Sequence, residues 1–147
     1  LVTRLGFGKT DVIQMLNGCI GGLVAITAEP LMPSPHAAIL IGGVGGVIVV
    51  FGTKLLFAMK IDDVVGAVPA HLFAGIWGTL AVPITNPDTV FSTQLLGVVS
   101  INAFVFVVAY IVWTIMKATI GIRLSKEGET KGTDVTETGV IAYAIRD

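Results

Sequence analysis

His71 is the residue whose type and setting most favour chemistry. The interval from Val64 to Pro87 contains no Lys, Arg, Asp or Glu, and His71 lies in its first half. An ionisable side chain inside a long apolar segment is energetically costly, which favours a functional role. An imidazole accepts a proton on one nitrogen while it donates from the other, so His71 suits a proton relay. The alternative is a buried structural histidine that is hydrogen-bonded to a neighbouring helix.

Small residues recur near this histidine. Ala67, Ala74, Gly75 and Gly78 are spaced from His71 so that a helix would place them on the same face. Such a face allows either close packing of helices or a narrow conduit beside the imidazole.

Four other polar residues have candidate roles. Asp62 and Asp63 directly precede the uncharged interval. At a helix N-terminus a carboxylate accepts hydrogen bonds from free amides, so at least one of the pair is expected to cap a helix. The pair also predicts an entrance that attracts cations. Asn17 and Thr27, in an earlier apolar segment, either hydrogen-bond within a helix bundle or line a pore.

The sequence lacks the groupings that support catalysis or metal binding. It has no Gly-rich phosphate loop, no nucleophile beside a base and no metal-spaced set of His and Cys. Cys19 is the single cysteine, which excludes an internal disulfide and a multi-cysteine zinc site. The net charge of -1 argues against a nucleic-acid-binding surface. We therefore predict a protein that is not an enzyme, without a cofactor, a metal or a nucleic-acid partner.

Membrane-spanning helices are the elements predicted to position these residues. Of the 147 residues, 54% are hydrophobic and 13% are charged, whereas a soluble domain has about 25% charged residues. A helix needs about 20 mainly apolar residues to cross the hydrocarbon layer, so the sequence predicts an all-α integral membrane protein. The predicted membrane domain is residues 1–116, with spans at 12–28, 36–57, 64–84 and 91–116, and residues 117–147 form a polar tail.

The basic residues all lie on one side of this topology. The connections Glu29–Pro35 and Thr85–Val90 carry no Lys or Arg. By the positive-inside rule these two turns face outward, and both ends of the chain are cytoplasmic in a cell membrane.

Glycines spaced four residues apart predict close packing between helices. Such pairs allow helix backbones to approach one another. The predicted packing glycines are Gly18 with Gly22, Gly42 with Gly46, and Gly75 and Gly78 in the third span.

Two separated motifs resemble the family of Amt, Mep and Rh ammonium transporters. The first is DDVVGAVPAHLFAGIWGTL, from Asp62 to Leu80, in which an acidic pair precedes a histidine and a Gly-Ile-Trp-Gly-Thr run follows it. In the tail, Gly121-Ile122-Arg123 resembles the end of the family's last helix, and residues 132–143 resemble its cytoplasmic carboxy-terminal motif. The resemblance covers essentially the whole chain.

The resemblance implies a carboxy-terminal portion of a transporter, with the last four of eleven helices. It implies a homotrimer with one narrow hydrophobic pore per subunit, in which ammonium is deprotonated and the amine and the proton pass separately. His71 resembles the second of two pore histidines, Asn17 and Thr27 resemble the inner pore lining, and Asp63 resembles the inner vestibule. The resemblance assigns a regulatory role in the tail to Gly132, Asp134, Glu137, Gly139 and Tyr143.

Three positions depart from the family pattern. Gly66 stands where some members have Asp, Leu72 where many have Gly, and Thr138 where the tail motif usually has His. The change at Thr138 bears on whether a PII-type signalling protein binds the tail. Beside ammonium transport, two other functions stay open: an ammonium sensor, and a truncated chain that inserts without conducting.

Overall fold

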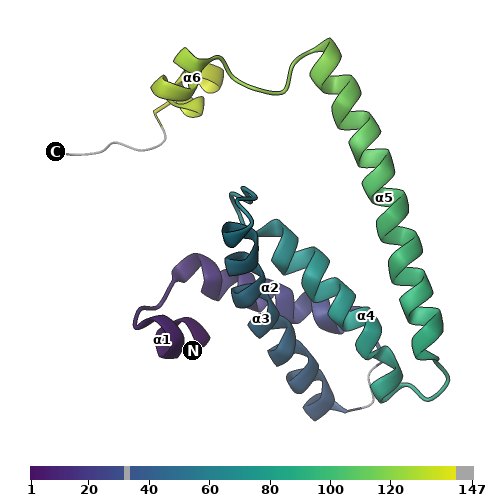
Figure 1. The fold of residues 1–147 in the computed structure, drawn as a ribbon. Helices are drawn as coiled ribbons and strands as arrows, with labels where there is room; N and C mark the ends of the chain where they lie inside the picture. Colours follow the sequence, from purple (N-terminus) through teal and green to yellow (C-terminus); the bar gives the residue numbers. More distant parts are fainter. Residues whose placement is uncertain (32–33, 142–147) are drawn as a thin grey trace. The chain divides into compact units, whose positions relative to one another are not determined.

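The computed structural model describes residues 1–31 and 34–141. No strand occurs among these residues, so the predicted all-α fold is confirmed. The chain divides into two units, residues 1–102 and residues 103–147. The elements, labelled in Figure 1 where there is room, are α1 (Val2–Phe7), α2 (Val12–Ile26), α3 (Pro35–Ala58), η1 (Val68–Phe73), α4 (Ala74–Thr85), α5 (Phe91–Thr119), α6 (Lys126–Lys131) and η2 (Asp134–Thr138).

Glycines carry the contact between α2 and α3 in the first unit. Gly18 lies against Gly46 whereas Gly22 lies against Gly42, so the two helices run antiparallel. A Cβ added to Gly22 would lie 3.0 Å from the carbonyl oxygen of Gly42. The predicted glycine pairs thus meet across two helices, backbone against backbone.

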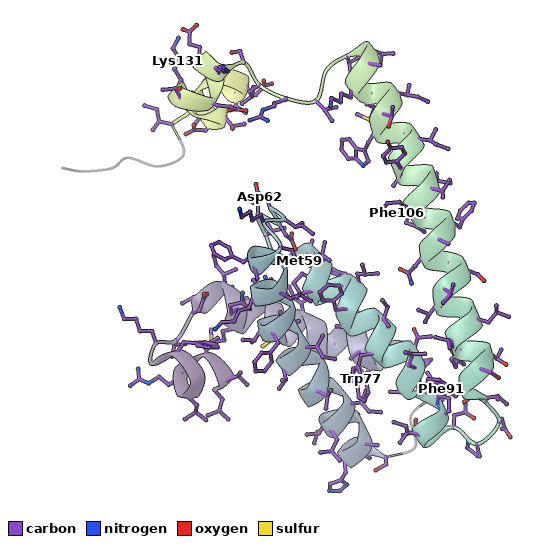
Figure 2. The ribbon with its side chains drawn as sticks, in the orientation of Figure 1. Met59, Asp62, Trp77, Phe91, Phe106 and Lys131 are labelled. Carbon is purple, nitrogen blue, oxygen red and sulfur yellow. The ribbon has the colours of Figure 1, made fainter. Side chains whose placement is uncertain are left out.

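A small buried core joins α4 to this helix pair. Ala25, Ile41 and Ala81 are buried together, and Trp77 packs against them. The indole N–H of Trp77, labelled in Figure 2, donates to the carbonyl oxygen of Ile41 at 3.0 Å. This bond ties α4 to the backbone of α3.

Three helical segments of the described chain are long and apolar enough to cross a membrane. They are α3, the continuous segment formed by η1 and α4, and α5. α2 has 15 residues, which at 1.5 Å per residue spans about 22 Å, against about 30 Å for the hydrocarbon layer. α2 begins at Val12, where the first span is predicted to begin, and ends at Ile26, two residues before the predicted end.

α5 carries apolar side chains along its length and has no buried residue among those described. Phe91 and Phe106, labelled in Figure 2, are 53% and 72% exposed. A helix that is apolar on all sides is typical of a membrane span.

Candidate functional site

Asp63 organises the start of the segment that carries His71. Its Oδ1 accepts a hydrogen bond from the Ala67 amide and its Oδ2 accepts one from the Val68 amide, each 2.9 Å long. Amides at the start of a helix lack an intrahelical acceptor, which the carboxylate replaces. The prediction that one residue of the acidic pair caps a helix is confirmed, whereas Asp62 is exposed.

The turn that contains His71 is a π-helix, where the sequence pattern predicted an α-helix from residue 64. Pro69 lies in this turn and has no amide hydrogen, so it cannot donate to an α-helical ladder. The Ala74 amide reaches back five residues to the carbonyl oxygen of Pro69, and it also donates to that of His71. Single π turns inside α-helices are frequent at functional sites. Pro69 is the signal that could have indicated this irregularity.

The π turn directs His71 away from the packed side of its helix. Pro69, Ala70 and Ala74 are buried, whereas His71 and Leu72 are exposed. Within the described part of the chain, no hydrogen bond to the imidazole is present. Among the described residues, His71 therefore does not form the hydrogen bond to a neighbouring helix that the structural alternative requires.

The two glycines that follow His71 differ in their surroundings. A Cβ added to Gly78 would overlap the backbone of Ala25, whose C and Cα atoms would both lie 2.8 Å away. A Cβ added to Gly75 would meet Val24 at an ordinary contact distance of 3.7 Å. Gly78 thus belongs to the contact with α2, and Gly75 leaves space on its side of the helix.

Asn17 ties α2 to the loop that precedes η1. Its Nδ2 donates to the carbonyl oxygen of Val65 at 2.7 Å, and the residue is 9% exposed. Gly66 has a φ of +73°, and a Cβ there would collide with the Asn17 amide. Thr27 lies at the other end of α2, about 15 Å away at 1.5 Å per residue, and its hydroxyl donates to Val24. The structure therefore places Asn17 beside the acidic loop and separates Thr27 from it.

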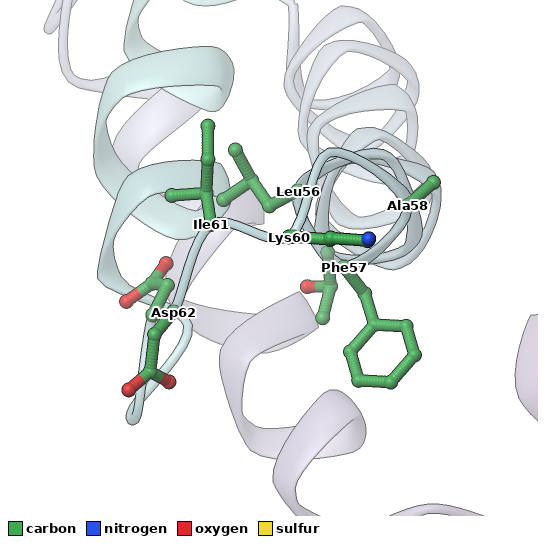
Figure 3. Close-up of a pocket in the computed structure, with 8 residues that line it drawn as sticks. Leu56, Phe57, Ala58, Lys60, Ile61 and Asp62 are labelled. Carbon is green, nitrogen blue, oxygen red and sulfur yellow. The ribbon is translucent and has the colours of Figure 1, made fainter.

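An open hollow of about 610 Å³ adjoins the acidic pair. Figure 3 shows residues that line it around the end of α3, among them Lys60 and Asp62. Asp63 also lines it. The hollow thus carries charges of both signs. No group of three potential metal ligands occurs among the described residues.

The tail holds a small folded element in which α6 contacts η2. The Ser125 hydroxyl accepts a hydrogen bond from the Gly128 amide at 3.1 Å and caps α6. The Thr136 hydroxyl donates to the carbonyl oxygen of Gly128 at 3.3 Å. Gly128 is buried, and a Cβ there would lie 3.1 Å from Thr136.

Four of the five residues predicted for regulation lie in or at the ends of these helices. Gly132 ends α6 with a φ of +103°, and Gly139 ends η2 with a φ of +69°. Both conformations favour glycine over residues with a side chain. Asp134 and Glu137 lie within η2, and Tyr143 lies outside the described residues.

Arg123 and Glu129 form a bidentate ion pair beside α6. Arg123 Nε donates to Glu129 Oε1 at 2.6 Å, and Nη2 donates to Oε2 at 3.2 Å. The hydrogen bond, with the attraction of opposite charges, raises the pKa of Arg123 and lowers the pKa of Glu129. The pair is exposed to solvent, so it orients the chain more than it stabilises it.

Comparison with known proteins assigns the family. The model of the Ammonium Transporter Family matches residues 1–143. The chain belongs to the ammonium transporter family. Ammonium transporter Amt2 of Archaeoglobus fulgidus is 35% identical over 162 residues, which cover 97% of this chain and 35% of that protein. A relative from Synechocystis sp. is 40% identical over 133 residues, with 89% and 30% covered. Ammonium transporter Amt1 of Haloferax mediterranei is 33% identical, with 92% and 27% covered.

The match confirms the family predicted from the two motifs. It agrees with a membrane location, since three helices are long and apolar enough to cross a bilayer. The chain spans about a third of the length of these relatives.

Proposed function

We propose that this chain forms part of a pathway for ammonium or ammonia across the membrane, with His71 as a proton relay. One observation carries the proposal: an uncharged helix presents an exposed His71 that has no hydrogen-bond partner among the described residues. Family membership supports the substrate, since relatives over the matched region are named ammonium transporters.

The relay explains how a charged substrate passes an uncharged helix. A full positive charge at the membrane centre costs about 2.5–3.5 kcal/mol or more, whereas a neutral amine avoids this penalty. In the proposal, ammonium loses a proton before it reaches the apolar segment. One imidazole nitrogen of His71 accepts the proton and the other nitrogen releases one, so the ring returns to neutrality. Asn17, beside the acidic loop, lines the inner part of the route, and Asp63 lies in the inner vestibule. Thr27 ends α2 next to the turn that faces outward in this topology, so the proposal gives it no place in the inner lining.

The proposal also includes the assembly. The spans form the last four of eleven helices, the subunits form a homotrimer, and both ends of this chain are cytoplasmic. The one-sided distribution of Lys and Arg supports this orientation. The folded tail element, with its glycine-bounded η2, is the proposed binding site for a PII-type signalling protein.

The test measures ammonium-induced current from proteoliposomes on a supported membrane. The liposomes contain the chain alone, or the chain joined to the upstream helices of the Archaeoglobus relative. We expect current only from the joined protein, and we expect His71→Ala to change its proton readout or its selectivity for ammonium over potassium. Ile84→Ala, at an exposed position of the same helix, is the control.

Two results would contradict the proposal. Wild-type current and proton movement in His71→Ala would exclude the relay. Current from the chain alone would exclude its assignment as one portion of the pore.

A further inference from the structure

We infer that Gly52 of α3 is a positioning residue for His71, acting through the π turn between them. The inference rests on the proposed relay role of His71. The inference adds Gly52, a residue on another helix, which acts on His71 only through the residues that flank His71.

Gly52 lies in a notch formed by two residues of η1. A Cβ added to Gly52 would lie 2.6 Å from Cδ2 of Phe73 and 2.9 Å from Cβ of Pro69. Pro69 and Phe73 lie two residues before and two residues after His71. Atoms of Pro69 and Phe73 therefore occupy the space that a methyl group at position 52 would need.

The packed side of the π turn and its histidine side are parts of one short, rigid unit. Pro69 is fully buried and Ala70 is 1% exposed, while His71 is exposed. The Ala74 amide closes the turn onto the Pro69 carbonyl oxygen. A displacement of Pro69 and Phe73 therefore rotates the imidazole on the opposite side.

A methyl group at position 52 would push η1 and α3 apart, and withdrawal of α3 would break its close contact with α2. Seven residues earlier, at Gly45, α3 is held against α2, where an added Cβ would lie 2.7 Å from the Gly21 carbonyl oxygen and 2.8 Å from Cβ of Ala25. Protein interiors have little free volume to absorb such a push. The Phe73 ring and the π turn can move without breaking the contact between α3 and α2.

The experiment measures the imidazole of His71 directly in the full chain in lipid bilayers. His36→Gln leaves His71 as the single histidine, because the sequence has two. The readouts are the nitrogen chemical shifts of the ring and its rate of modification by diethyl pyrocarbonate. We expect Gly52→Ala to shift the ring resonances and to change the modification rate several-fold.

Two glycines of the same helix are matched controls. Gly43→Ala adds a methyl group to α3 where no atom lies within 4 Å, so both readouts should stay unchanged. Gly45→Ala disturbs the contact with α2 without a clash in η1, so it reports a general packing defect. We expect Gly52→Ala to exceed Gly45→Ala in its effect on His71, even where Gly45→Ala destabilises the chain more.

A rescue variant tests the route of the effect. Phe73→Leu in the Gly52→Ala background replaces the planar ring with a smaller side chain whose methyl groups can turn away from position 52. We expect partial recovery of the His71 signals. Phe73→Leu alone, with Gly52 retained, loosens the notch without a clash and should shift His71 modestly. It provides the test if Gly52→Ala does not fold.

The inference is overturned if Gly52→Ala leaves the His71 signals as unchanged as Gly43→Ala does. It is also overturned if Gly45→Ala changes the His71 signals as much as Gly52→Ala does. If Gly52→Ala does not fold, unchanged His71 signals in Phe73→Leu overturn it instead. These outcomes are separate from the relay itself. An altered imidazole with wild-type current in His71→Ala would refute the relay and leave the positioning intact.

Discussion

Gly75 and Gly78 offer a matched test of how closely α4 packs on α2. The two glycines lie one turn apart on the same helix, and both were predicted to pack helices. In the structure, Gly78 meets the backbone of Ala25, whereas a Cβ on Gly75 would meet Val24 at 3.7 Å. The same substitution, glycine to alanine, should therefore have opposite effects at the two positions.

The expected magnitudes follow from two opposing contributions. Alanine in place of glycine inside a helix stabilises it by about 1 kcal/mol. Overpacking typically costs about 1–3 kcal/mol. The upper end of this overpacking cost applies at Gly78, because an added methyl group there would meet the backbone of Ala25 rather than a side chain that can rotate away. Gly78→Ala should thus lower the free energy of unfolding by about 2 kcal/mol, and Gly75→Ala should raise it by up to about 1 kcal/mol.

The assay is reversible unfolding of the full chain in mixed micelles, followed by helical circular dichroism. The two variants should differ by about 3 kcal/mol, which is more than a hundredfold in the unfolding equilibrium constant. Equal stability of Gly75→Ala and Gly78→Ala would refute the close backbone contact. So would a stabilised Gly78→Ala, since the contact leaves no room for its methyl group.

Two further predictions concern groups outside the buried contacts. Asp63→Ala should destabilise the chain by about 1 kcal/mol, because it removes the carboxylate that accepts hydrogen bonds from two amides at the start of a helix. The same unfolding assay on Asp62→Ala, at an exposed position, should show a smaller loss of stability. The folded tail element should loosen as the pH falls from 4.5, the ordinary pKa of a glutamate, through the lowered pKa of Glu129. The Glu129 carboxylate contributes fully to stability above pH 4.5, and this contribution is lost as the carboxylate is protonated. Amide hydrogen exchange of α6 measures this, and Glu129→Gln should remove the pH dependence; unchanged dependence in that variant would show that Arg123 does not hold the element through this pair.

The helices and one cap could be predicted because their causes are local in the sequence. An apolar run of sufficient length predicts a span, and an acidic pair before such a run predicts a cap, which Asp63 provides. The glycine spacing predicted close contacts, but it could not say which glycine would face which. The antiparallel pairing of Gly18 with Gly46 depends on the crossing of two helices, which no single segment encodes.

The π turn and the notch at Gly52 could not be predicted from periodicity. A hydrophobic pattern reports an average repeat, and one extra residue in one turn changes that average little. Pro69 indicates that the turn is irregular, while its geometry depends on the contacts that Gly52 makes from another helix. The open side of His71 is likewise a consequence of which residues are buried against α2 and α3. Local sequence therefore predicts the presence of the histidine in a span, and tertiary packing decides its direction.

Volume, more than polarity, should decide which substitutions the first unit tolerates. It contains close contacts onto backbone, at Gly45 with Gly21 and at Gly78 with Ala25, where one methyl group exceeds the available space. Two of its side-chain hydrogen bonds between segments, from Trp77 and from Asn17, end on backbone carbonyl oxygens. The side chain of His71 can then be oriented without a hydrogen bond, because small residues on the packed side of its helix fix the path of the helix. Conservative apolar substitutions at these glycines should therefore disturb the proposed relay more than polar substitutions on the exposed face.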